Sequence, residues 1–266
     1  MNKIKQKIKK SLDLASFGKG FTDRFKLFIL PFWISLEKKF KFFYNFDLSV
    51  NLILNGKFAR IKITDSYDYD TLYDVFVNGE YFFGDDFSPK IIFDLGGHVG
   101  YTAIYFHLLY PEAMIYVFEP SLDNFNKLKI NTANIDKIKT FNIAVAAASG
   151  QLPFYHNNKK STSSSLVARG EEAPSEMVKA KTLDQLMSEL GISHIDVLKF
   201  DIEGSEYSVF KNSNHLSDIN ILVGELHPGL IRVKVDDFYE LFKGFEVSVD
   251  QKTSEKSKFL AKNSRF

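Results

Sequence analysis

The chain has 266 residues, of which 45% are hydrophobic and 25% are charged. This composition is typical of a globular protein with one sizeable core and a small appended subdomain. The absence of cysteine excludes disulfides and thiolate metal sites, and a cytoplasmic location is expected. A net charge of +1 lacks the basic excess of a nucleic-acid-binding protein, so no nucleic-acid partner is expected.

The first 45 residues differ in charge from the remainder. They carry eleven Lys and Arg against three Asp and Glu, a net charge of +8, which leaves about −7 for everything after them. In a helix, Ile4 and Ile8 would form an apolar stripe opposite lysines. Aromatic residues follow at Phe25, Phe28, Phe32 and Trp33.

Two interpretations of this basic segment stay open. It is either a helical region that packs on the domain, or an amphipathic segment that docks on the anionic inner face of a membrane. The apolar run over residues 27–36 is too short to span a bilayer and contains Pro31. We therefore expect no transmembrane helix, and the first residues lack a cleavable signal pattern.

Residues 46–88 predict a small α+β cap. Apolar and polar residues alternate around Asn55-Gly56, a strong hairpin signal, and a helical pattern follows near residues 71–77.

From residue 89 to 250, short β-branched runs alternate with helical patterns. This alternation predicts an α/β fold with a Rossmann-like, doubly wound, mostly parallel sheet. A polar insertion over residues 151–180, with the serine run 161–165, interrupts the pattern. Residues 251–266 read as a polar, basic tail that could be frayed.

The carboxyl ends of parallel strands carry the ligand sites of such sheets, and the first end holds a glycine turn. Asp94, Gly96, Gly97 and Gly100 follow the run IIFDL and open a helix. The dinucleotide fingerprint is not matched because His98 replaces its second glycine, so a cofactor without a pyrophosphate fits better.

Three further strand ends carry acidic side chains or a histidine. Glu119 lies nineteen residues beyond Gly100, close to the spacing at which an acidic residue binds ribose hydroxyls. Asp201 begins a carboxylate cluster that includes Glu206. The alternative for Glu206 is an ordinary acidic cap at the start of a helix. Glu225 and His227 end the next strand on one side of it, and Glu225 is expected to orient the imidazole as a general base.

With these four ends in place, the chain resembles the FkbM methyltransferase family over residues 64–230. The resemblance rests on IIFDLGGHVGYTA, YVFEPSLDNFNKLKIN, Thr182-Leu183-Asp184, VLKFDIEGSEYSVF and VGELHP. It implies a class I methyltransferase fold, S-adenosylmethionine as cofactor, and O-methylation of a sugar or natural product. The family usually has Asn where this chain has His98.

By this resemblance, Glu119 would hold the ribose, Ala144 and Val145 would border the adenine, and Asp201 would face the sulfonium. The bottom-up chemistry agrees, because a sulfonium cation is stabilised by carboxylates and by aromatic rings such as Tyr101 or Phe118. The full set of expected cofactor contacts is Asp94, Gly96, Gly97, His98, Gly100, Tyr101, Thr102, Glu119, Pro120, Ala144, Val145 and Asp201.

The expected catalytic residues are Asp201, Glu225 and His227. His227 would take the acceptor's proton directly, or a divalent ion held by the same three residues would lower the hydroxyl's pKa. We rank the metal-free base first. The cap and the insertion would form the acceptor pocket for a small molecule or glycan. The alternatives are a nicotinamide-dependent oxidoreductase and a non-catalytic nucleotide-binding protein at the membrane surface.

Overall fold

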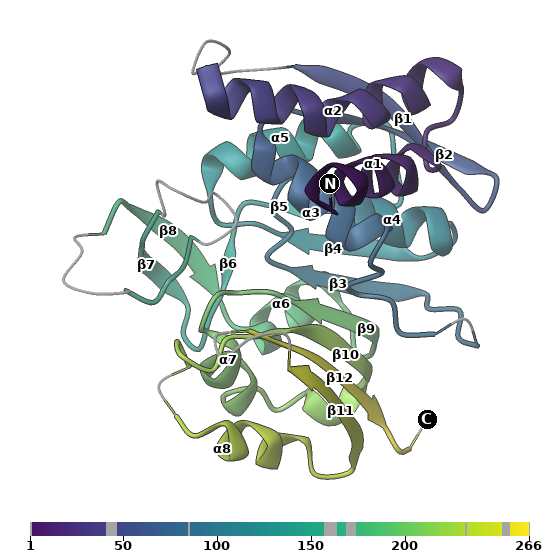
Figure 1. The fold of residues 1–266 in the computed structure, drawn as a ribbon. Helices are drawn as coiled ribbons and strands as arrows, with labels where there is room; N and C mark the ends of the chain where they lie inside the picture. The colour runs from purple at the N-terminus through teal and green to yellow at the C-terminus, as the bar shows by residue number, and fades with distance from the viewer. Residues whose placement is uncertain are drawn as a thin grey trace.

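The computed structural model describes residues 2–40, 47–84, 86–156, 164–168, 174–231, 233–251 and 256–265 (Figure 1). A central sheet separates two hydrophobic cores, one on each of its faces. Its seven strands lie in the order β11-β12-β10-β9-β3-β4-β5. Their bounds are β3 Ile91–Leu95, β4 Met114–Phe118, β5 Ile138–Phe141, β9 Ile195–Phe200, β10 Ile219–Leu226, β11 Phe245–Gln251 and β12 Ser257–Asn263.

The five strands from β10 to β5 are parallel, and β12 is antiparallel to both of its neighbours. The strand order reverses between β3 and β9, because the chain winds outward from β3 to β5 and then returns to the other side. This arrangement confirms the predicted doubly wound, mostly parallel sheet. Ligands bind such sheets at this reversal, outside the carboxyl ends of the strands.

Successive residues of each strand point to opposite faces, and two cores result. Ile92, Ile115 and Val197 join one core with helices α4 (Tyr101–Leu109) and α5 (Leu122–Thr132). Phe93 and Leu198 join the other core with α6 (Leu183–Leu190), α7 (Glu206–Lys211) and α8 (Val235–Tyr239). Both faces of the sheet are therefore covered, as the continuous apolar strands predict.

The N-terminal region packs against the first of these cores. Strands β1 (Leu48–Leu54) and β2 (Lys57–Ile63) form the predicted hairpin, and Asn55 and Gly56 both have positive φ at its turn. Helix α3 (Ser66–Phe76) begins five residues earlier than the sequence pattern indicates, because Asp65 and Asp68 form a capping box.

Helices α1 (Asn2–Ala15) and α2 (Phe21–Phe40) contribute to the same core through Leu14, Leu27 and Leu30, which are fully buried. The structure supports the interpretation in which the N-terminal helices pack on the domain. None of the helices within the described residues has the length and hydropathy to cross a bilayer.

The expected C-terminal tail is wrong for residues 257–263, which form β12 between β10 and β11. The basic composition of this stretch hides an alternation in which Ser257, Phe259, Ala261 and Asn263 are buried. Phe259 packs in an aromatic cluster, with its ring centroid 5.0 Å from that of Phe242. Burial of one face therefore outweighs the polar character of the segment.

The polar insertion contributes two strands to a second sheet. Strands β6 (Ala144–Val145), β7 (Gly150–Phe154) and β8 (Glu176–Lys181) form a separate sheet in the order β6-β8-β7, which projects to one side (Figure 1). Residues 161–163 of the predicted serine run lie outside the described residues.

Candidate active site

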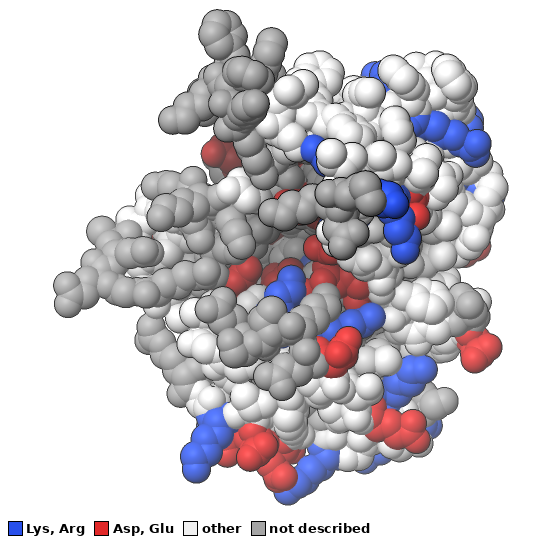
Figure 2. Space-filling view, in the orientation of Figure 1, with Lys and Arg blue, Asp and Glu red and all other residues white. Residues whose placement is uncertain are grey.

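One cavity of about 960 Å³ opens at the carboxyl ends of β3, β4, β9 and β10. Figure 2 shows acidic and basic side chains gathered in the hollow between the N-terminal and C-terminal halves of the molecule. The volume is at the upper end of the range for small-molecule sites, so cofactor and acceptor can occupy it together. As predicted, the cap and the insertion contribute to its wall, through α3 and through residues 164–168.

The glycine turn after β3 lines the cavity at Gly96 and Gly97. Gly96 has φ +79°, and a Cβ there would lie 2.0 Å from the carbonyl oxygen of Asp201. A Cβ on Gly97 would lie 2.0 Å from Cγ1 of Val117. These glycines are therefore required for packing against the neighbouring strands, in addition to the ligand approach that the sequence predicts.

Two residues of the predicted cofactor loop lie beneath it and not on the cavity wall. Asp94 is fully buried, and its carboxylate lies 2.9 Å from Nζ of Lys199. Lys199 also donates to the carbonyl oxygen of Gly96 at 2.7 Å. Gly100, with φ +94°, is the N-cap of α4. We interpret Asp94 and Gly100 as supports of the loop, and a direct cofactor contact by either stays a prediction.

Glu119 lines the cavity directly after β4. Its carboxylate accepts hydrogen bonds from the backbone N–H of His98 at 2.8 Å and of Ser121 at 2.9 Å. Burial raises the pKa of Glu119 to about 7, against the effect of those hydrogen bonds. The acidic side chain is thus held rigidly at the position where the sequence predicts ribose binding.

His98 lies opposite Glu119 in an unusual backbone conformation. Its φ is +47°, and among the described residues only Asn55 and Glu203 are other non-glycine residues with positive φ. Such conformations cluster at functional sites. Burial lowers the pKa of His98 to about 4, so the ring is neutral at neutral pH. A neutral side chain here is in keeping with the Asn that the family usually has.

The remaining predicted cofactor residues also line the cavity, namely Tyr101, Thr102, Pro120, Ala144 and Val145. The ring of Tyr101 is held in place because its hydroxyl donates to the carbonyl oxygen of Lys62 in β2, at 2.8 Å.

The sequence also suggested the ring of Phe118 as a contact for the sulfonium, and this suggestion is wrong. It is fully buried and stacks on Phe141 at 5.3 Å, within the core. It does not reach the cavity, because its side chain points to the face of the sheet covered by α6 and α7.

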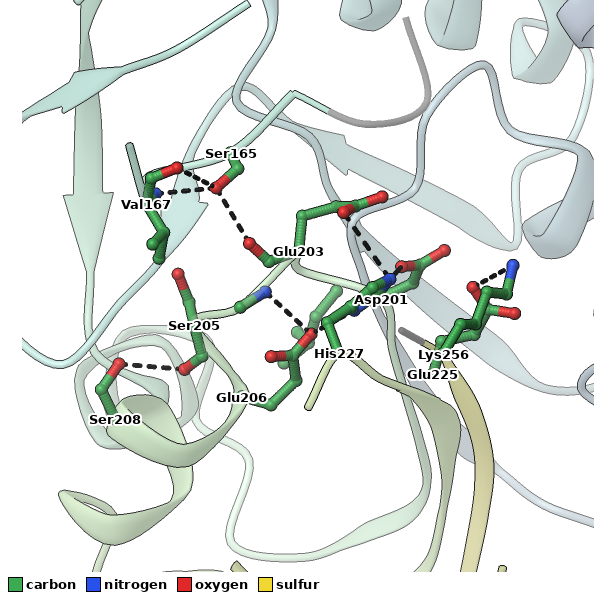
Figure 3. A network of polar contacts seen from close by, with 12 residues as sticks. Ser165, Val167, Asp201, Glu203, Ser205, Glu206, Ser208, Glu225, His227 and Lys256 are labelled. Carbon is green, nitrogen blue, oxygen red and sulfur yellow. Dashed lines mark hydrogen bonds and ion pairs between the residues drawn. The ribbon is translucent and has the colours of Figure 1, made fainter. Parts of the chain in front are cut away.

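The opposite end of the cavity holds a polar cluster around His227 (Figure 3). Nδ1 of His227 lies 2.9 Å from Oε1 of Glu206. Nε2 lies 3.6 Å from Glu203 and 3.9 Å from Asp201. The ring is thus oriented by Glu206, whereas the sequence analysis expected Glu225 to do so. The buried Glu206 also accepts from the N–H of Gly204 at 3.1 Å.

Glu225 forms an ion pair with Lys256 and is nearly fully buried. Its burial, together with the charges of Asp201 and Glu80, raises its pKa to about 8. It lines the same cavity as His227, as the alternation along β10 predicts.

The electrostatics of the cluster bear on its chemistry. Burial alone would lower the pKa of His227, but the hydrogen bond to Glu206 and the charges of Glu206, Asp201 and Glu203 raise it to about 10. The pKa of Asp201 would likewise rise through burial, yet Lys199, His227 and Lys256 lower it. At neutral pH the end of the cavity therefore carries an imidazolium beside an ionised Asp201.

The same cluster contains the expected metal ligands. Asp201, Glu225 and His227 each offer a ligand atom, and these atoms all lie within 4.8 Å of one another. A nitrogen and two carboxylate oxygens suit divalent ions, so the donor set fits a metal as well as a base.

Sequence reasoning missed several residues of this end. The hydroxyl of Tyr81 donates to Asp201 at 3.1 Å, and Lys256 reaches Glu225 from the residue before β12. Neither lies in a motif. Glu203 and Glu206 do lie in the stretch KFDIEGSE, which carried the signal, but their orientation depends on the positive φ of Glu203 and Gly204.

The sheet order, with a glycine turn at its reversal point, defines a Rossmann-like domain. The family model described as "Methyltransferase FkbM domain" matches residues 94–246, more than half of the chain. The protein belongs to the FkbM methyltransferase family. This match confirms the predicted methyltransferase and supports S-adenosylmethionine as its cofactor.

Individual relatives are more distant. The chain is 27% identical over 199 residues to the methyltransferase sdnD of Sordaria araneosa, covering 62% of this chain and 76% of that one. It is 26% identical to the 2-O-methyltransferase NoeI of Sinorhizobium fredii (45% and 55% covered). It is also 26% identical to the hexuronic acid methyltransferase AglP of Haloferax volcanii (54% and 58% covered). The matches thus span just over half the length of the last two relatives.

Among solved structures, Aeropyrum pernix fibrillarin with natively bound S-adenosyl-L-methionine is similar at a TM-score of 0.46 and 13% sequence identity. The superposition covers 79% of this chain and 81% of that one.

Proposed function

We propose that the protein transfers the methyl group of S-adenosylmethionine to a hydroxyl group of a sugar. The carrying observation is that one cavity joins a nucleoside-type half, formed by the glycine turn and Glu119, to a half where Asp201 and His227 converge. The name of one relative, a hexuronic acid methyltransferase, supports a sugar acceptor, and the name of another, a 2-O-methyltransferase, supports transfer to oxygen.

The cofactor residues present fit S-adenosylmethionine. Bound there, it supplies an electrophilic methyl group on a sulfonium. Glu119 accepts hydrogen bonds and would bind ribose hydroxyls, while the ionised Asp201 would face the positive charge. The cofactor carries no phosphate, so it does not need the second glycine that His98 replaces.

His227, Glu225 and Asp201 would serve the transfer step. The acceptor hydroxyl must lose a proton, and Nε2 of His227 faces the cavity with its ring fixed by Glu206. The raised pKa keeps that ring protonated at neutral pH. His227 could accept a proton only once the positive charge of the bound sulfonium offsets the charges of Asp201 and Glu203. Alignment of the acceptor and exclusion of water would supply the rest of the rate.

The charge of the wall favours a neutral or amino sugar over a uronic acid. Asp70 and Asp74 of α3, with Glu80 and Glu203, line the cavity, where Lys256 is already engaged with Glu225. A carboxylate on the acceptor would meet like charges at short range, which costs binding energy in a partly buried site.

The test has two arms. Calorimetry should detect binding of S-adenosylmethionine and not of a nicotinamide dinucleotide. Transfer of labelled methyl should then be compared for glycans that end in neutral hexose, hexosamine or hexuronate. Absence of cofactor binding would sink the proposal, and transfer to hexuronate alone would sink its acceptor part.

A further inference from the structure

Helix α2 has two apolar faces, and only one of them is buried. Leu27, Leu30 and Ile34 face the core. On the opposite side the exposed residues recur at helical spacing, which places them on one stripe about 22 Å long. They are Phe21 (86% exposed), Phe25 (55%), Ile29 (37%), Trp33 (40%) and Leu36 (56%).

This α2 stripe is larger than folding requires. A polar residue at each exposed position would let α2 pack equally well, since the buried side already anchors it. Contiguous exposed apolar surface of this extent in a soluble protein marks a surface that binds a partner. Ile4 and Leu12 of α1 are also more than half exposed.

The charges around the α2 stripe indicate which partner fits. Exposed basic side chains lie on both helices and on the turn between them, at Lys5, Lys9, Lys19 and Arg24. The first 45 residues carry a net charge of +8, against about −7 for the rest. In Figure 2 the region of α1 and α2 is mostly white, with basic side chains around it.

We propose that α1 and α2 dock the protein on an anionic bilayer, with the α2 stripe buried at the boundary of headgroups and acyl chains. A helix that combines large apolar side chains with flanking lysines and arginines lies in this plane. Trp33 suits the interface because tryptophan is enriched there. Helix α2 forms an outer ridge of the molecule, a shape that meets a flat bilayer without a matching groove (Figure 1).

The chain contains a single tryptophan, so Trp33 is a built-in reporter. Full-length protein is mixed with vesicles of phosphatidylcholine alone or with phosphatidylglycerol. With anionic vesicles we expect a blue shift of the emission, co-sedimentation, and loss of both at high salt. An unchanged emission, or equal binding to neutral vesicles, would overturn the proposal.

Paired substitutions sharpen the test. Phe25→Ser with Ile29→Ser removes part of the α2 stripe but keeps Trp33, and should lower vesicle partitioning by about tenfold or more. Lys5→Gln with Lys9→Gln should weaken binding and its salt dependence. Ile130→Ser on α5 is the matched control, because Ile130 is 59% exposed outside this surface.

We expect the Ile130→Ser control to bind anionic vesicles normally, and we expect an unchanged melting temperature for all variants. Wild-type binding by the stripe variant would refute the proposal, as would self-association through the stripe without vesicle binding. The assay needs no methyl transfer, so its result is independent of the proposed function.

Discussion

The two halves of the cavity are built in different ways. The half proposed to bind the cofactor, called the cofactor half, comes from consecutive turns after β3 and β4. Its polar groups are hydrogen-bonded to the backbone, as when Glu119 accepts from two N–H groups. The half proposed to bind the acceptor, called the acceptor half, is lined by residues that lie far apart in the chain, from α3, the insertion, Glu225, His227 and Lys256. A rigid, motif-encoded half can therefore serve a shared cofactor while the other half varies with the substrate.

Breaking the support beneath the cofactor half should have the largest effect on stability. Lys199→Met would leave Asp94 buried without its ion pair, which costs about 3–5 kcal/mol in the free energy of unfolding. Denaturant unfolding measures this. The double variant Lys199→Met, Asp94→Leu should regain much of the loss, and a double variant as unstable as the single one would argue against the ion pair as the cause.

In the acceptor half, His227→Ala should lower turnover by about 100-fold or more, the usual range for a lost general base. Affinity for S-adenosylmethionine should stay near wild type. Glu206→Gln, which can still accept from Nδ1, should lose less. Chelation distinguishes the metal-dependent mechanism from the metal-free base, because only a metal-dependent enzyme loses activity with EDTA and regains it with Mg²⁺ or Mn²⁺. Normal turnover by His227→Ala would remove both mechanisms.

In the cofactor half, Glu119→Ala should weaken S-adenosylmethionine binding by about 10- to 100-fold, the value of a hydrogen bond to a charged group. Calorimetry gives the comparison. Asp123→Ala, at the exposed start of α5, is the control and should bind normally. Unchanged affinity in Glu119→Ala would take this carboxylate out of the site.

The smallest effect concerns pH. Burial raises the pKa of Glu119 from 4.5 to about 7, so the carboxyl gains a proton as the pH falls through 7. Only the ionised form would accept from both ribose hydroxyls, so affinity should fall by about tenfold per pH unit below 7. Glu119→Gln cannot titrate and should bind with the same affinity at pH 6 and pH 8. Parallel pH profiles for the two proteins would contradict this assignment.

The difference between the halves also explains what the sequence could predict. The glycine turn, Glu119 and Asp201 lie at strand ends that periodicity identifies, so their convergence follows from a parallel sheet. Lys256 enters the site only because β12 inserts between β10 and β11, a pairing that its basic sequence conceals. Tyr81 lies outside any motif, and the choice of Glu206 over Glu225 as the partner of His227 depends on local backbone conformation.

The most direct test of the account is a crystal structure of the protein with S-adenosylhomocysteine. We expect both ribose hydroxyls within hydrogen-bond distance of Glu119, the adenine against Ala144 and Val145, and the sulfur directed toward Asp201. A ligand seated between α3 and the insertion, with Glu119 untouched, would contradict the division of the cavity into a cofactor half and an acceptor half.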